Sequence, residues 1–351
     1  MSTHEVALSR VRLGPVRPTM TQVAEQAGVS LKTVSRVINN EKWVSEQTAK
    51  RVLRVIAELG YEADIQAGNL RRLDGLTRSI GLLVGAIDNP FHAVLARAIE
   101  EEAISREVTV LINSLDHDAE RERKVVSGFL RRRVDGLLLT TATQSQEYLS
   151  IEQTHGTPVV FIDSIPKGIA ADAVLSDSKE GAFLGANHLI ERGHRRIAYI
   201  DLSEATTTLR ERHEGFLAAI AAAGIPASMT PTVLTGLDAS EAERAIAHLL
   251  RSDDPPTAIF SAHYITTIGV VRALQHADRH RSVALVGFDD LAFADLLDPG
   301  ITVVTQDPRR IGIRAAELVF DRLDGKSAPP AIHRIPTTLI PRGSGEIVPA
   351  A

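Results

Sequence analysis

Two basic side chains stand four residues apart near the amino end of the chain, Lys32 and Arg36 in the run SLKTVSRVIN. Residues at positions i and i+4 lie on the same face of a helix, so both side chains would point the same way. A guanidinium can donate two hydrogen bonds to a guanine edge, and an ammonium can reach a base or a phosphate. The spacing indicates a DNA-reading helix; a helical bundle with a solvated basic face is the alternative.

A second group of polar residues follows apolar runs further along the chain. It comprises Asp88-Asn89-Pro90-Phe91, Asp163, Asp201 with the following segment 206–212, His263-Tyr264 and Asp289-Asp290. In open α/β sheets, ligands bind outside the carboxyl ends of the strands. Carboxylates and arginine hydrogen-bond to vicinal hydroxyls, and an aromatic ring can stack on a sugar ring. These residue types predict a cleft for a small polyhydroxylated ligand.

The basic pair belongs to a segment, residues 18–61, with the pattern of three short helices. Apolar residues recur three and four positions apart in each: Val23, Ala24 and Ala27, then Val34, Val37 and Ile38, then Val52, Val55, Ile56 and Leu59. Residues that favour helix starts and ends stand between them: the capping-box pair Thr19 and Gln22, then Gly28, Ser30, Ser45 and Gly60. Three short helices around one small core predict a helix-turn-helix unit.

The remainder, residues 76–344, alternates short apolar runs with helical patterns. The predicted strands are 80–84, 108–112, 134–139, 159–162, 196–200, 258–260, 283–288 and 301–304. Predicted helices include 91–106, 119–132, 180–192, 209–223, 239–251 and 309–323. Such alternation predicts parallel sheets covered by helices on both faces. Because this segment is longer than one such sheet usually needs, we expect two α/β lobes.

Charge and composition narrow the class of protein. Residues 1–72 hold 11 Lys and Arg against 7 Asp and Glu, a net charge of +4, while the remainder carries −9. A basic head on an acidic body suggests that the head meets a polyanion. Cysteine is absent, which excludes disulfides, and no apolar run approaches the roughly 18 residues of a membrane span. Residues 1–17 lack the apolar stretch of a secretory signal and are interpreted as a disordered leader.

The head resembles the recognition unit of the lactose-repressor (LacI/GalR) family of bacterial transcription regulators. The similarity lies in VAEQAGVSLKTVSRVIN, residues 23–39, and VSEQTAKRVLRVIAELGY, residues 44–61. The resemblance implies that bases are read by Leu31, Lys32 and Arg36, and that Thr19, Ser30, Thr33, Ser35 and Asn39 lie at or near the phosphate backbone. A helix cap and a packed small residue are the alternatives for Ser30 and Ser35.

The linker that follows, residues 62–75, corresponds to the hinge of this family, which folds on the operator. The resemblance implies that Ala67 and Leu70 contact DNA, with the leucine in the minor groove. The chain departs from the family at Ala63 and Asp64, where Pro-Asn is usual, and at Gly68, where Arg or Gln is usual. Because glycine costs about 1 kcal/mol in a helix interior, we expect this hinge to depend more on DNA and dimer contacts.

The body resembles the core of the same family, which is similar to periplasmic sugar-binding proteins. Matching stretches lie at 80–91, 133–137, 188–197, 286–290, 306 and 339–344. The resemblance implies one lobe of about 76–175 and 307–330, a second of about 176–304 and 335–341, and a tail at 345–351. By position it implies effector contacts from Phe91, Asp163, Thr206, Thr208, Arg212, His263, Asp289 and Gln306.

Three of these positions have structural alternatives. Arg212 could be a surface residue at a helix start, and Asp289 could be a helix cap. His263 stands where the family usually has Asn, and a structural histidine is as good an interpretation as a ligand contact. If His263 does contact the ligand, we expect an effector other than the common hexoses.

The most consistent interpretation is a homodimeric repressor that binds a near-palindromic operator and is controlled by a small effector, a sugar or related metabolite. We expect a cytoplasmic protein with no catalytic residues, no metal and no cofactor. His276 and His280, four residues apart, could hold a metal, but a solvated helix end explains them better. The main alternative is a cytoplasmic sugar sensor without DNA activity, in which Lys32 and Arg36 have no role.

Overall fold

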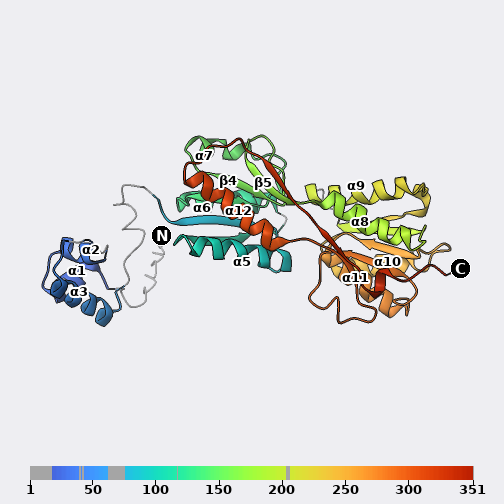
Figure 1. Ribbon diagram of the computed structural model, residues 1–351, viewed down its shortest axis with the longest axis horizontal. Helices are drawn as coiled ribbons and strands as arrows, with labels where there is room; N and C mark the ends of the chain where they lie inside the picture. Colours follow the sequence, from blue (N-terminus) through green and yellow to red (C-terminus); the bar gives the residue numbers. More distant parts are fainter. Residues whose placement is uncertain are drawn as a thin grey trace, which may run out of the picture. The chain divides into compact units, whose positions relative to one another are not determined.

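The structure is a computed structural model that describes residues 18–38, 41, 43–61, 76–116, 118–202 and 206–350. The chain divides between Thr77 and Arg78 into an amino-terminal head and a larger core. Figure 1 shows both, and each is described by itself. The leader expected at 1–17 and the hinge expected at 62–75 lie outside the described residues.

The head contains three helices, α1 (Met20–Ala27), α2 (Leu31–Ile38) and α3 (Glu46–Leu59), as the sequence predicts. Val23, Val34 and Val52 are fully buried where the helices meet, and Val37, Ile38 and Leu59 pack around them. Gly28 ends α1 with φ of 62°, a left-handed conformation that glycine adopts without steric cost. The tight turn that follows lets α2 start at Leu31.

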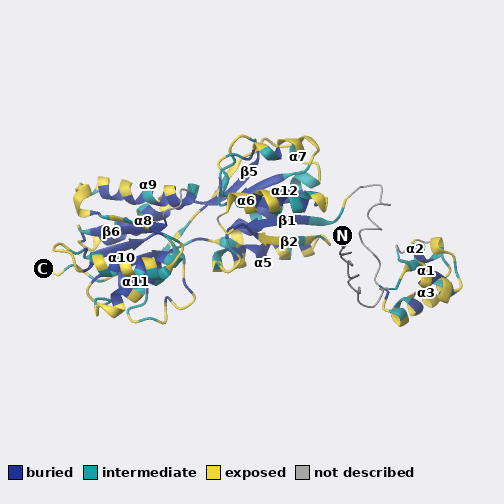
Figure 2. Cartoon of the chain, turned by 180° about the vertical axis from the view of Figure 1, so that it is seen from behind, coloured by how far each residue is buried: buried dark blue, intermediate teal, exposed yellow. Residues whose placement is uncertain are grey.

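The first lobe of the core is a parallel sheet of six strands in the order β11-β5-β4-β3-β1-β2. The strands are β1 (Ser79–Val84), β2 (Thr109–Ser114), β3 (Gly136–Leu139), β4 (Val159–Ile162), β5 (Asp172–Ser176) and β11 (Ile332–Ile335). Helices α5 (Pro90–Ile104) and α12 (Pro308–Leu323) cover one face. Helix α6 (Ala119–Arg131) packs on the other, near η1 (Glu147–Leu149) and α7 (Ser150–Thr154). Leu82 and Leu83 point to opposite faces of the sheet, as successive residues of a strand do. Neither is exposed to water, because helices cover both faces of the sheet (Figure 2).

The second lobe repeats this plan with the order β12-β10-β9-β8-β6-β7. Its strands are β6 (Ile197–Leu202), β7 (Thr232–Thr235), β8 (Ala258–Ser261), β9 (Ala284–Phe288), β10 (Thr302–Thr305) and the antiparallel β12 (Thr338–Ile340). Helices α8 (Ser178–Glu191) and α9 (Thr207–Ala222) cover one face, and α10 (Ala239–Leu249) and α11 (Tyr264–His276) the other. Two single turns, η2 (Ala227–Met229) and η3 (Gly343–Gly345), complete it. A Cβ on Gly215 of α9 would lie 2.0 Å from the Lys179 carbonyl oxygen, so the α8–α9 contact requires glycine.

The chain passes between the lobes three times, at residues 176–178, 305–308 and 335–338. The two-lobed fold predicted from the sequence is confirmed, but one expected boundary differs. The return segment of the first lobe extends to β11, which pairs with β5, rather than stopping near residue 330. The sequence IHRI of β11 lacks an apolar run because this strand lies at the sheet edge.

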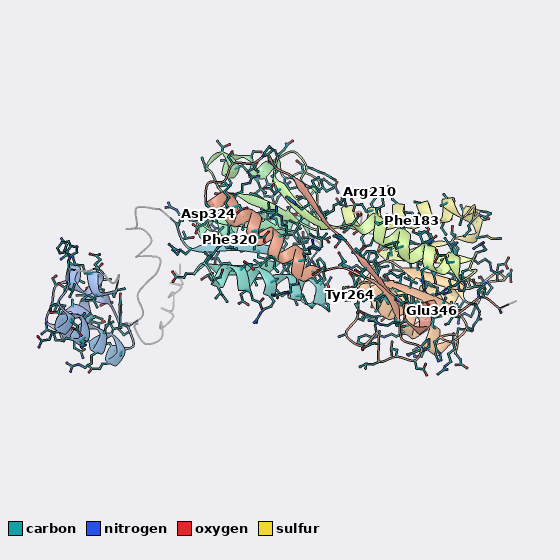
Figure 3. The ribbon with its side chains drawn as sticks, in the orientation of Figure 1. Phe183, Arg210, Tyr264, Phe320, Asp324 and Glu346 are labelled. Atoms are coloured by element: carbon teal, nitrogen blue, oxygen red, sulfur yellow. The ribbon has the colours of Figure 1, made fainter. Side chains whose placement is uncertain are left out.

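Glu346 and Ile347, within the tail expected at 345–351, pack against the second lobe. Ile347 contacts the apolar core beneath α8, and its carbonyl accepts a 2.8 Å hydrogen bond from His194 Nε2. Glu346, labelled in Figure 3, pairs with Arg192 at 2.5 Å. None of the described helices is long and apolar enough to cross a membrane.

Candidate functional site

Helix α2 presents its amino-terminal half to solvent. Leu31 is 49% exposed and Lys32 is exposed, whereas Val34 between them and Arg36 is fully buried. Arg36 is half-buried, and its Nε lies 3.6 Å from Glu41 Oε2. Of the three residues expected to read bases, Leu31 and Lys32 are therefore exposed and Arg36 is half-buried.

The residues expected near phosphates have different environments in the structure. Thr19 caps α1 through a 3.3 Å bond from Gln22 N, and Ser30 caps α2 through a 3.1 Å bond from Thr33 N. The Ser30 hydroxyl also lies 2.9 Å from that of Thr33, so Ser30 caps the helix, and its contact with a phosphate stays a prediction. Ser35 is half-buried on α2. The remaining expected contacts, Asn39, Ala67 and Leu70, lie outside the described residues.

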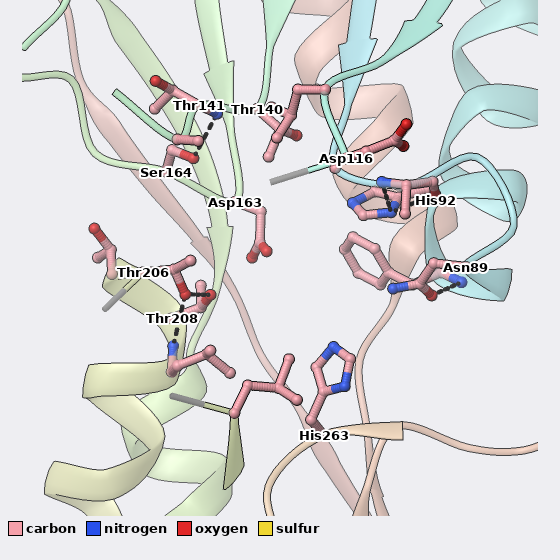
Figure 4. A pocket seen from close by; sticks show the side chains of 18 of the residues that line it. Asn89, His92, Asp116, Thr140, Thr141, Asp163, Ser164, Thr206, Thr208 and His263 are labelled. Atoms are coloured by element: carbon pink, nitrogen blue, oxygen red, sulfur yellow. Dashed lines mark hydrogen bonds between the residues drawn. The ribbon is translucent and has the colours of Figure 1, made fainter. Parts of the chain in front are cut away.

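The core contains a cavity of about 530 Å³ between its two lobes. All eight residues expected to contact an effector line it: Phe91, Asp163, Thr206, Thr208, Arg212, His263, Asp289 and Gln306. Figure 4 shows Asp163 reaching from the first lobe toward Thr208 and His263 of the second. The fold therefore brings together residues that lie up to 215 positions apart in the sequence.

Arg212, on the first turns of α9, is the central cation of the pocket. Its side chain is buried, and Nη1 donates a 2.6 Å hydrogen bond to the Ala262 carbonyl. Its guanidinium lies 3.9 Å from the centre of the Phe288 ring, and Nη1 is 3.8 Å from Asp289 Oδ2. Nε is buried without a hydrogen-bond partner. Arg212 is therefore not the surface residue of the alternative interpretation, since its side chain is buried and lines the cavity.

A chain of hydrogen bonds joins the pocket to two of the segments that connect the lobes. Asp289 Oδ1 accepts from Gln306 Nε2 at 2.5 Å, and Gln306 Oε1 accepts from Ser176 Oγ at 2.5 Å. Asp289 follows β9 with φ of 75° and begins no helix, so the alternative of a helix cap is wrong. Because Ser176 and Gln306 lie where the chain passes between the lobes, a ligand bound to Asp289 would lie close to the segments that connect the two lobes.

Asp163 is the acid with the most unusual environment. Burial raises its pKa from 3.8 to about 7, against the lowering effect of the nearby Arg212 guanidinium. Its Oδ1 atom is buried without a hydrogen-bond partner, and a hydrogen bond from Thr208 favours the ionised form. An acid with this pKa can either donate or accept a hydrogen bond near neutral pH.

The other predicted pocket residues are held by helix starts. Thr206 caps α9 by accepting from Leu209 N at 3.3 Å, and His263 caps α11 by accepting from Ile265 N at its Nδ1 atom. His263 therefore has a structural role, and it also lines the pocket. Phe91 stands at the start of α5, where its ring meets that of His92 at 5.3 Å.

Two of the acids that were expected at the pocket because they follow strands, Asp201 and Asp290, do not line it. The side chain of Asp201 accepts from Tyr199 OH at 2.6 Å and from Leu202 N at 2.8 Å, inside the second lobe. Burial raises its pKa to about 6. Asp290 makes two hydrogen bonds with Arg342 instead. Neither lines the main cavity.

Other lining residues were not predicted. They are mainly on the first lobe: His92, Asp116, Ser164, Lys167 and the loop of residues 140–146 that follows β3. The same strand-end argument applies to this loop, but its apolar and hydroxyl residues carry no conspicuous charge. Among the described residues no three His, Asp or Glu side chains are placed to hold a metal ion, although His276 Nδ1 lies 2.8 Å from Glu243.

Comparison with known proteins identifies the family. The model for bacterial regulatory proteins of the lacI family matches residues 19–64, and that for a periplasmic binding protein-like domain matches residues 186–345. The HTH-type transcriptional repressor PurR of Erwinia tasmaniensis is 31% identical over 330 residues, which cover 93% of this chain and 96% of that protein.

Solved structures share the fold. A LacI family transcriptional regulator from Enterococcus faecium with bound ribose is 25% identical, with a TM-score of 0.70 over 78% of this chain and 100% of that one. The lac repressor dimer bound to operator and the anti-inducer ONPF is 24% identical, with a TM-score of 0.82 over 93% of this chain and 99% of that one. The chain therefore belongs to the LacI family of bacterial regulatory proteins.

Proposed function

We propose that this protein is a homodimeric repressor in which a neutral sugar of the ribose class, bound between the lobes, controls operator binding. The observation that carries the sugar assignment is the convergence of Arg212, Asp163 and Asp289 in one cavity. Arg212 Nε and Asp163 Oδ1 are both buried without partners. Vicinal hydroxyls, which donate and accept, satisfy such a pair.

The charge of the pocket favours an uncharged ligand. Four acids line it, Asp88, Asp116, Asp163 and Asp289, against the cations Lys167 and Arg212. A phosphate or carboxylate would bring further negative charge into an acidic cavity, which is unfavourable at low dielectric. A phosphorylated sugar is therefore expected to bind worse than its neutral parent. The bound ribose in the Enterococcus faecium regulator supports this ligand class.

The head supplies the DNA-binding half of the function. Leu31, Lys32 and Arg36 of α2 would enter the major groove, and two heads would read the halves of a near-palindromic operator. The action is ligand binding and release rather than catalysis, and it needs no cofactor. A repressor acts where the chromosome is, so the protein is assigned to the cytoplasm.

Thermal unfolding in the presence of ligands tests the pocket. D-ribose should raise the unfolding temperature of the wild-type protein, and ribose 5-phosphate should raise it less. Arg212→Met keeps an unbranched apolar stem and removes the guanidinium donors, so ribose should no longer stabilise that variant. Arg210→Met, at a neighbouring exposed position of α9, is the matched control and should respond like the wild type. Equal stabilisation of wild type and Arg212→Met would exclude this binding mode.

A further inference from the structure

A buried carboxylate that does not line the pocket is bonded to one of its walls. Glu122 lies on the first turn of α6 and is 1% exposed. Oε2 accepts from the amides of Ala142 and Thr143 at 2.7 and 2.9 Å. Oε1 accepts from the Thr143 hydroxyl at 2.8 Å and from Tyr148 OH at 2.7 Å. The Thr141 hydroxyl lies within 2.9 Å of both oxygens.

The groups that bind this carboxylate belong to the pocket. Thr141, Ala142 and Thr143 line the cavity, and they lie in the loop after β3 that the sequence did not mark. Thr141, labelled in Figure 4, also donates its amide to Ser164 of a second lining loop at 3.3 Å. The Glu122 side chain of α6 therefore holds the loop of residues 140–146 by hydrogen bonds on the side away from the cavity.

Gln146 extends this attachment to the second loop. Its Nε2 donates to the Thr143 carbonyl at 2.9 Å, and its Oε1 accepts from Lys167 N at 2.7 Å. The backbone amide of Gln146 donates to the Lys167 carbonyl at 2.9 Å. Through Glu122 and Gln146 the two loops form one hydrogen-bonded unit, which makes up much of the first-lobe side of the cavity.

We propose that Glu122 is a positioning residue: its buried carboxylate holds residues 140–146 in the shape that forms the first-lobe wall of the effector pocket. This inference rests on the proposed function for the ligand, but the placement of the loop does not. Only an ionised carboxylate offers acceptors alone on both oxygens. An amide would turn an N–H group toward hydroxyls that now donate, and an apolar side chain would leave two backbone amides without acceptors.

Three variants test the role of the carboxylate. Glu122→Gln keeps the shape and removes the charge, and Glu122→Met keeps the length and removes both acceptors. Glu120→Gln is the matched control, because Glu120 is an exposed residue two positions earlier on the same helix.

Hydrogen exchange of the ligand-free protein measures the loop directly. Peptides that cover residues 141–148 should exchange at least tenfold faster in Glu122→Met, and by a smaller factor in Glu122→Gln. Strand β3 and the second lobe should exchange as in the wild type. Unchanged exchange of residues 141–148, or faster exchange across the whole first lobe with a general loss of stability, would overturn the positioning role.

Calorimetric titration with D-ribose then measures the consequence for the pocket. The dissociation constant should rise at least tenfold in Glu122→Met and stay within twofold of the wild type in Glu120→Gln. A loosened loop with unchanged ribose affinity would refute the link to the ligand. A wild-type protein that ignores ribose would instead refute the proposed ligand, while the exchange experiment would still decide the role of Glu122.

Discussion

Replacement of Asp163 by Asn should stabilise the protein increasingly as pH rises. The folded state raises the pKa of this acid from 3.8 to about 7 because burial disfavours the charge. Folding therefore favours the protonated form. The contribution of Asp163 to stability is complete below about pH 4 and is lost as pH rises through 7. Asparagine has a similar shape and carries no charge at any pH.

The size of the effect follows from the pKa. A rise of about 3 pH units corresponds to about 4 kcal/mol at pH well above 7, at about 1.4 kcal/mol for each unit. Near pH 5 the Asp163 side chain is mostly protonated in the folded state but mostly ionised in the unfolded chain, so Asp163→Asn should already be more stable by about 1.5 kcal/mol. For a unit of this size, 1 kcal/mol corresponds to about 2 to 4 °C in unfolding temperature.

Urea unfolding of both proteins at pH 5, 7 and 9 measures the difference in free energy. Other groups that titrate in both proteins largely cancel in that difference. We expect the advantage of Asp163→Asn to grow with pH, toward about 4 kcal/mol at pH 9. A difference that is constant from pH 5 to 9, or a wild type that is more stable at pH 9, would refute the reasoning. Ribose binding by Asp163→Asn should be weakened, since the site loses an acceptor.

Three further predictions concern other parts of the chain. Asp201→Asn should also stabilise with rising pH, but the gain should level off above the Asp201 pKa of about 6; a pH-independent difference would contradict it. Arg334→Met breaks the pair in which Arg334 donates to both oxygens of Glu211 at 2.6 and 2.9 Å. Water screens this partly exposed pair, so a loss of about 1 kcal/mol in urea unfolding is expected, and no loss would count against it. Arg36→Ala should cost about 1 to 3 kcal/mol of discrimination between operator and mutated duplexes in binding titrations. Exposed Arg54→Ala is its control, and equal behaviour of the two variants would argue against base reading by Arg36.

The sequence sufficed for the architecture and for much of the pocket lining. Periodicity located the three helices of the head, and strand–helix alternation predicted two parallel-sheet lobes. The eight pocket residues that the family resemblance implied all line one cavity. The carboxyl ends of parallel strands meet at one edge, which explains why they lie together. The rule does not fix which way a side chain points. Asp201 therefore follows the pattern, yet it bonds to Tyr199, two residues earlier on the same face of the strand.

Other features depend on contacts that no local pattern encodes. The strands β7 and β11 lie at or next to sheet edges with exposed faces, so they lack the apolar runs that mark central strands. In the sequence Glu122 looks like an ordinary solvent-exposed charge on a helix, because its hydrogen-bond partners are 19 to 26 residues away. Its burial follows from the packing of α6 against the sheet. The position of the loop of residues 140–146 next to the carboxylate depends on the tertiary packing of α6 and β3.

The central claim is that the pocket of the core controls DNA binding by the head. Fluorescence anisotropy of a labelled duplex from the promoter of the protein's own gene tests it, with full-length wild type and Arg212→Met, in the presence and absence of D-ribose. We expect both proteins to bind the duplex and ribose to change only the wild-type dissociation constant, by about 5- to 150-fold. Failure of the wild type to bind any duplex at low salt, or an equal ribose response in both proteins, would contradict the account.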